Sequence, residues 1–219
     1  MFILLFSAVI PAVLLMIWIY KWDQLHPEPK RHVLRLFVMG ALVPLPAALI
    51  ERHLLITKAL SPNPQSLVGI LLTAFFVAGA VEELLKALFF YKGIYRHREF
   101  DEPIDGVVYA VAVSLGFAMV ENILYVSSYG LATAFLRSVT AIPGHMFFGI
   151  IMGYYFSRAK MGRSRLSAAF AIPAFFHGVY DSFAMSDGFR ANVALLVYLL
   201  ILLFFSLNII SRLKRMVIN

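Results

Sequence analysis

The chain has 219 residues, of which 61% are hydrophobic and 14% charged, and its mean hydropathy is +0.83. Soluble domains contain about 45–50% apolar and about 25% charged residues. The composition therefore indicates a polytopic membrane protein, which we expect to form a single domain over residues 1–219. The net charge of +7 is typical of basic loops on one side of a membrane, and no soluble basic face predicts nucleic-acid binding. Because cysteine is absent, disulfides, thiolate zinc sites and a cysteine nucleophile are excluded.

Hydropathy predicts an all-α bundle of about seven transmembrane helices, and an eighth, re-entrant segment stays open. The expected spans are about residues 2–20, 33–56, 66–91, 105–129, 132–156, 167–185 and 192–211. Pro44 and Pro46 predict a kink in the second span. Gly149 and Gly153, four residues apart in the fifth span, predict a close helix–helix contact.

Lysine and arginine residues predict the orientation of the bundle. With the N-terminus outside and the C-terminus in the cytoplasm, the expected cytoplasmic segments at 21–35, 92–98, 158–165 and 212–215 contain 14 of them. The expected external residues number 4, namely Arg52, Lys58, Arg137 and Arg190. This asymmetry alternates correctly across the expected spans and therefore supports their number and their orientation.

Polar and ionisable side chains interrupt four consecutive spans in the middle of the chain. The third span contains EELLK, the fourth FAMVEN, the fifth HMFFG and the sixth HGVYD. The residues are Glu82, Glu83, Lys86, Glu121, Asn122, His145, His177 and Asp181. Because a charged side chain at the bilayer centre costs roughly 2.5–3.5 kcal/mol, we expect these residues to be functional.

These groups are expected to converge on one intramembrane polar site. A rise of 1.5 Å per residue puts them about 14–24 Å from the cytoplasmic ends of their spans, inside a hydrocarbon layer about 30 Å thick. Residues four apart share a helix face. Glu82 and Lys86 therefore point in one direction, and His177 and Asp181 share a face of another helix.

Several of these residues also have simpler interpretations. Glu82 and Lys86 could merely neutralise each other, and His145 could bond a neighbouring helix without a role in catalysis. Asp105, at the expected membrane edge, is interpreted as an interfacial cap. Glu121 is harder to explain in this way, because it has no basic partner in its own helix and therefore needs either protonation or a partner on another helix.

Known intramembrane proteases have motifs that can be sought in the sequence. The serine type needs GxSG, the zinc-dependent site-2 type needs HExxH, and the presenilin type needs GxGD; this chain contains none of them. Carboxylates with histidines remain. A glutamate can take a proton from water, while a histidine orients that water or stabilises a tetrahedral oxyanion.

Four motifs carry a resemblance to a known family. EExxK at 82–86, FxxxE at 117–121, His145, and HxxxD at 177–181 occur in the order and spacing of the PrsW family of bacterial intramembrane proteases. The chain resembles this family, a distant relative of the CAAX prenyl proteases, over essentially its whole length. The resemblance implies a multi-pass peptidase of the bacterial plasma membrane. It also implies that the enzyme makes the site-1 cut in a single-pass membrane anti-sigma factor, during regulated intramembrane proteolysis in envelope stress.

The resemblance also implies roles for single residues. Glu82 would be the general base with support from Glu83, and His177 and Asp181 would stabilise the oxyanion. The candidate catalytic residues are Glu82, Glu83, Glu121, His145, His177 and Asp181, with Lys86, Phe117 and Asn122 in support.

Three positions depart from the CAAX pattern. Lys86 lies one residue earlier than the usual arginine, Glu121 replaces a histidine, and Asp181 replaces an asparagine. Two carboxylates near one water invite either a proton that stays on one of them or a divalent cation between them. A plausible nitrogen and oxygen ligand set for zinc consists of Glu82, Glu121, His145, His177 and Asp181. Glutamate-type and metal-dependent hydrolysis both stay open.

Other functions also stay open from the sequence. A CAAX-type protease could act on another membrane substrate or on a small peptide. A proton- or cation-coupled transporter would use the same groups as a relay, and it predicts an inverted repeat between halves, which the sequence does not show. A non-catalytic membrane scaffold predicts that Glu82→Gln is harmless.

Overall fold

The computed structural model describes residues 2–22, 27–58, 63 and 65–218, and this part of the chain is helical, without strands. Its helices are α1 (Phe2–Tyr20), α2 (Lys30–Leu42), α3 (Pro44–Ile56), α4 (Leu67–Leu72), α5 (Ala80–Phe90), α6 (Asp105–Tyr129), α7 (Leu131–Val139), α8 (Ala141–Lys160), α9 (Ala168–Ala184) and α10 (Phe189–Ile218). Two π-helical segments, η1 (Thr73–Gly79) and η2 (Tyr91–Tyr95), precede and follow α5. The helical class predicted from the sequence is confirmed.

Within the described residues, five helical stretches are long and apolar enough to cross a membrane. They are Lys30–Ile56, Leu67–Tyr95, Asp105–Tyr129, Leu131–Lys160 and Phe189–Met216, and they match the second, third, fourth, fifth and seventh expected spans. The first and sixth expected spans are also helices, but α9 has only 17 residues, and the apolar stretch found in α1 covers Phe6–Tyr20. The total of seven crossings therefore stays a prediction.

Two irregularities shape the helices around the polar residues. The helix of the second span is interrupted between Leu42 and Pro44, where the sequence predicts a kink. In the third span, η1 ends directly before α5 and widens the helix three residues ahead of Glu82. Because a π-type turn rotates the following residues relative to the preceding ones, η1 helps to set the direction in which the acidic pair of α5 points.

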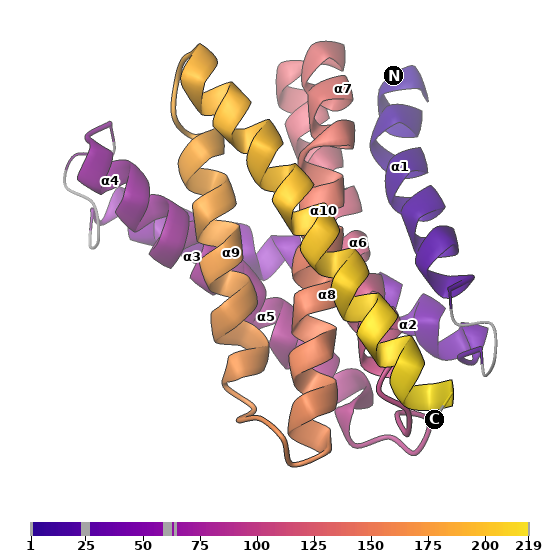
Figure 1. Ribbon diagram of the computed structural model, residues 1–219. Coiled ribbons are helices and arrows are strands. Elements are labelled where there is room, and N and C mark those ends of the chain that lie inside the picture. Colours follow the sequence, from indigo (N-terminus) through magenta and orange to yellow (C-terminus); the bar gives the residue numbers. More distant parts are fainter. Residues whose placement is uncertain (1, 23–26, 59–62, 64, 219) are drawn as a thin grey trace.

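α6 lies in the middle of the bundle and packs against α1, α2 and α8 (Figure 1). Every residue from Asp105 to Ala118 is buried. A side chain at Gly153 of α8 would overlap the carbonyl group of Gly106, and one at Gly149 would press on Ser114. The close contact predicted for the fifth span is therefore confirmed, and its partner is α6.

The basic segments expected on the cytoplasmic side meet at one end of the bundle. Lys160, at the end of α8, donates to the carbonyl groups of Tyr95 and His97. Lys214 of α10 lies over the ring of Trp22, with its Nζ 4.8 Å from the ring centroid. The C-terminal end of the chain is on this side and the N-terminal end is opposite (Figure 1). Which side of the membrane each end faces stays a prediction.

Candidate active site

Side chains from four helices meet around one cavity of about 340 Å³, which α3 and η1 close on the other side. The predicted residues that line it are Glu82 of α5, Glu121 of α6, His145 of α8, and His177 and Asp181 of α9. Glu83 and Lys86 are fully buried behind this wall. The structure thus brings all six residues predicted as catalytic into one cluster.

Lys86 lies at the centre of the cluster. Its Nζ donates to Glu82 Oε2 at 3.1 Å and to Glu83 Oε1 at 2.8 Å, across one turn of α5. A third contact, of 3.0 Å, joins Nζ to His145 Nδ1. The ring of Phe117 covers the ammonium, with its centroid 3.8 Å from Nζ. The ammonium therefore compensates two buried carboxylates and also reaches a second helix.

Lys86 also fixes the tautomer of His145. An ammonium can only donate, so His145 Nδ1 accepts, and its Nε2–H donates to Glu121 Oε2 at 2.8 Å. Glu121 also accepts from Arg137 Nη2 at 2.7 Å, and Arg137 Nε donates to Asn122 Oδ1 at 3.2 Å. One hydrogen-bond chain thus connects α5, α8, α6 and α7.

His177 lies between two carboxylates. Its Nδ1 is 3.0 Å from Glu83 Oε1, and its Nε2 is 3.3 Å from Asp181 Oδ2. The ring stacks on Phe148 with centroids 4.6 Å apart and planes 20° apart. It stands at 90° to the ring of His145, at a centroid distance of 5.1 Å. The stack on Phe148 and the contacts at both nitrogens hold this imidazole in one orientation.

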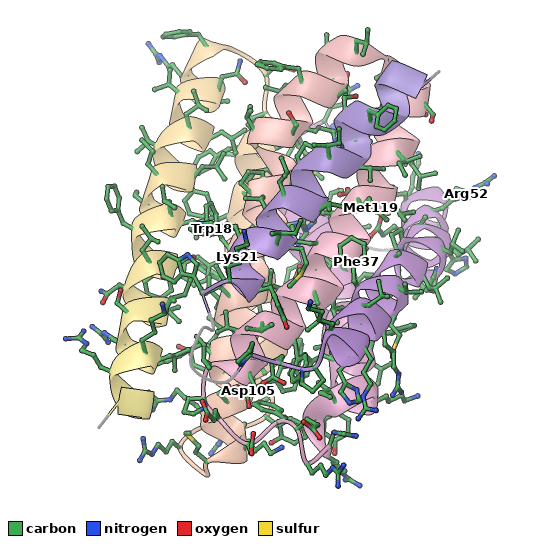
Figure 2. All side chains as sticks on the ribbon, turned by 90° about the vertical axis from the view of Figure 1, so that its right-hand side faces the viewer. Trp18, Lys21, Phe37, Arg52, Asp105 and Met119 are labelled. Atoms are coloured by element: carbon green, nitrogen blue, oxygen red, sulfur yellow. The ribbon has the colours of Figure 1, made fainter. Side chains whose placement is uncertain are left out.

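Two further residues of the site were not predicted from the sequence. Arg137, which we counted among the external residues, enters the cavity from α7 and pairs with Glu121. Glu51 of α3 lines the same cavity, and its Oε1 is buried without a hydrogen-bond partner, whereas the adjacent Arg52 points away from the bundle (Figure 2). Arg137 could have been found, because it is the single lysine or arginine of the next expected span and Glu121 could take a partner outside its own helix. Glu51 could have been found as well, because it is an acidic residue inside the second expected span, 33–56.

Carboxylates outnumber permanent cations in the described part of the site. The five carboxylates are Glu51, Glu82, Glu83, Glu121 and Asp181, and the two cations are Lys86 and Arg137. Buried negative charge without a counter-ion is strongly unfavourable. The cluster can relieve this imbalance by protonation of its carboxylates or histidines or by binding a further cation.

Four of the buried residues could hold a metal ion, because one ligand atom from each lies within 4.8 Å of the others. This candidate metal group consists of Glu82, Glu83, His145 and His177. Imidazole nitrogen and carboxylate oxygen are ligands that zinc accepts. The second oxygen of Glu83 is buried without a hydrogen-bond partner, which leaves it free to bind an ion. The donor set thus fits a divalent metal.

The candidate metal group differs from the ligand set expected from the sequence. Glu83 belongs to it, whereas Glu121 and Asp181 contact the Nε2 atoms of His145 and His177. A carboxylate on the second nitrogen of a histidine is the usual way to orient a histidine ligand. These two acids are therefore placed to orient ligands.

Comparisons with known proteins identify the family. Residues 28–208 match the family described as PrsW family intramembrane metalloprotease. The chain is 40% identical to Protease PrsW of Geobacillus kaustophilus over 185 residues, which cover 83% of this chain and 79% of the relative. It is 38% identical to Protease PrsW of Oceanobacillus iheyensis over 216 residues, covering 97% and 95% of the two chains. It is 33% identical to Protease PrsW of Bacillus subtilis over 186 residues, covering 83% and 82%.

No solved structure matches this chain. The relatives are proteases by name, and their similarity extends over most of both chains. A peptidase that works in a membrane is therefore supported over the transporter and the scaffold that the sequence left open. The chain belongs to the PrsW family of intramembrane proteases.

Proposed function

We propose that this chain makes the site-1 cut in a single-pass membrane anti-sigma factor, in the plasma membrane of a bacterium. The single observation that carries the chemistry is the convergence of carboxylates and two histidines on one cavity among apolar helices. The anti-sigma factor as substrate rests on the resemblance to the family. Bacterial relatives support the location.

Glu82 is our candidate for the general base. Its carboxylate lines the cavity, whereas the neighbouring Glu83 is fully buried and holds Lys86 and His177. Glu82 would take a proton from water while the water oxygen bonds to the carbonyl carbon of the scissile peptide. The same proton would pass to the amide nitrogen as the C–N bond breaks. Glu83 would act as a positioning residue.

His177 is our candidate for stabilising the oxyanion. Attack of water on a peptide carbonyl leaves a negative charge on its oxygen, and preorganised donors lower the energy of that state. His177 lines the cavity between Glu83 and Asp181, and it would exchange one of these partners for the oxyanion. His145, held by Glu121, would keep the opposite wall in place.

The donor chemistry also supports a divalent metal, and zinc fits it well. The candidate metal group would hold the ion, with Glu121 and Asp181 orienting its two histidines. When bound, such an ion supplies Lewis-acid activation of water and of the scissile carbonyl. The residues of this chain would then position the substrate and carry the proton.

The test uses purified protein in liposomes with a single-pass anti-sigma factor. Cleavage by the wild type and by Glu82→Gln is compared by mass spectrometry, each with and without a chelator. Loss of cleavage in Glu82→Gln, with the wild type unaffected by the chelator, supports glutamate-type hydrolysis. Loss of cleavage both in Glu82→Gln and in the chelator-treated wild type supports metal-dependent hydrolysis. If the wild type cleaves none of a panel of single-pass substrates, the proposed function is contradicted.

A further inference from the structure

The ammonium of Lys86 lies where a metal ion would meet its ligands. Its Nζ is 3.1 Å from Glu82, 2.8 Å from Glu83 and 3.0 Å from His145, and these are three of the four residues of the candidate metal group. These distances are those of hydrogen bonds. Zinc binds nitrogen and oxygen at about 2.0–2.2 Å. The ligands thus surround a cation that belongs to the chain.

Lys86 and a metal ion compete for the accepting nitrogen of His145 and for oxygens of two carboxylates. A histidine binds a metal through an unprotonated ring nitrogen, and in this structure the accepting nitrogen of His145 is Nδ1, which receives the Lys86 ammonium. The carboxylate oxygens of Glu82 and Glu83 that face Lys86 are likewise engaged. The single lone pair of His145 Nδ1 therefore cannot serve the ammonium and a metal at the same time, and the ammonium also takes up one lone pair on each of the two carboxylate oxygens.

Lys86 is held strongly in this position. Its side chain is fully buried, and its two carboxylate partners lie three and four residues earlier on the same helix. Phe117 covers it from α6. The ammonium is attached to the same helix as these two carboxylates. It therefore competes with a metal ion as an intramolecular cation, at an effective concentration above that of a free ion.

We propose that Lys86 is a built-in competitor of the metal ion: it stabilises the metal-free site and sets how tightly a divalent metal is bound. The inference rests on the proposed function, because it takes the candidate metal group as the metal site. The inference predicts that removal of the ammonium strengthens metal binding. The same change leaves two buried carboxylates without their partner.

The test measures zinc affinity directly, by competition with a chromophoric chelator, in the purified full chain in detergent. Metal-free wild type is compared with Lys86→Met, which keeps an apolar chain of similar length. We expect the variant to bind zinc at least about tenfold more tightly, because the competing ammonium is gone. A tenfold gain corresponds to about 1.4 kcal/mol of binding free energy. Lys86→Gln serves as a second variant if Lys86→Met does not give a monodisperse protein on gel filtration.

Arg137→Met is the matched control. Like Lys86→Met it removes one positive charge from the site, but the hydrogen bonds of Arg137 go to Glu121 and Asn122, which are outside the candidate metal group. An effect of charge alone would raise zinc affinity equally in both variants. Competition for the position raises it mainly in Lys86→Met, and adding Glu82→Gln to that variant should remove the gain.

Equal or weaker zinc binding by Lys86→Met and Lys86→Gln, or an equal gain in Arg137→Met, overturns the inference. Absence of zinc binding in every variant overturns it as well. Failure of the proposed function is a separate observation, because it shows as absence of cleavage by the wild type whatever the zinc affinities are.

Discussion

Two regions of the molecule bury carboxylates, and they satisfy them differently. Near the start of α6, Tyr109 donates its hydroxyl group to Glu28, and the backbone N–H groups of Asp101 and Glu102 donate to Asp105. Figure 2 shows Asp105 towards the end of the bundle. The donors named there are neutral groups. In the candidate active site the partners are an ammonium, a guanidinium and two imidazoles around a cavity.

This difference distinguishes buried carboxylates with a structural role from buried carboxylates that can take part in a reaction. A carboxylate that accepts from backbone N–H groups joins a loop to a helix and gains nothing by changing partners. A carboxylate that shares its oxygens with a lysine or a histidine beside a cavity can exchange these partners for water, substrate or an ion. Burial of an acidic residue alone therefore does not identify a catalytic group. Substitutions in the two regions test that distinction.

The largest effect is expected from Glu82→Gln compared with Asp105→Asn. Both replace a buried carboxylate by an amide of the same shape. Glu82→Gln should lower the cleavage rate by about 10²–10⁴, because a general base contributes that much. Asp105→Asn should stay within about threefold of the wild type, which corresponds to less than 1 kcal/mol in the barrier.

The measurement is the initial rate of cleavage in proteoliposomes, divided by the amount of monodisperse protein. Equal losses in the two variants would show that the buried carboxylates of both regions contribute equally to cleavage. The distinction between the two regions would then be wrong.

Lys86→Met should strongly destabilise the metal-free protein. Glu83 is fully buried, and it loses the ammonium that lies 2.8 Å from its Oε1. Breaking a buried ion pair from one side costs about 3–5 kcal/mol. Thermal unfolding followed by tryptophan fluorescence should therefore show a lower midpoint in the variant, and zinc should raise that midpoint more in the variant than in the wild type. An unchanged midpoint without zinc would mean that Lys86 does not compensate the two acids.

Arg137→Met should lower kcat by about 10–100-fold with little change in KM, because Arg137 acts through Glu121 on the orientation of His145. Arg52→Met removes the same charge from a side chain that points away from the bundle (Figure 2). We expect this control to behave like the wild type. A rise in KM without a fall in kcat would instead make Arg137 a substrate-binding residue.

The sequence predicted the parts of the fold and of the site that depend on local pattern. Apolar runs predicted the helices, and EELLK predicted that Glu82 and Lys86 meet, because residues four apart share one helix face. Arg137 and Glu51 reach the cavity from α7 and α3, and their positions depend on the rotation and tilt of whole helices against one another. Neither quantity follows from hydrophobic periodicity.

The smallest effect is expected from Tyr109→Phe, which removes the hydroxyl donor of Glu28 and leaves the ring in the core. Losing one donor to a buried acceptor costs about 1–3 kcal/mol, so the unfolding midpoint should fall slightly. The cleavage rate per folded molecule should not change, since this region does not touch the cavity. Tyr129→Phe, at an exposed tyrosine of the same helix, is the control for loss of a hydroxyl group and should change neither quantity. If Tyr109→Phe slows cleavage as much as Arg137→Met does, α6 couples the two regions. The buried acids near the start of α6 would then contribute to cleavage as well as to stability.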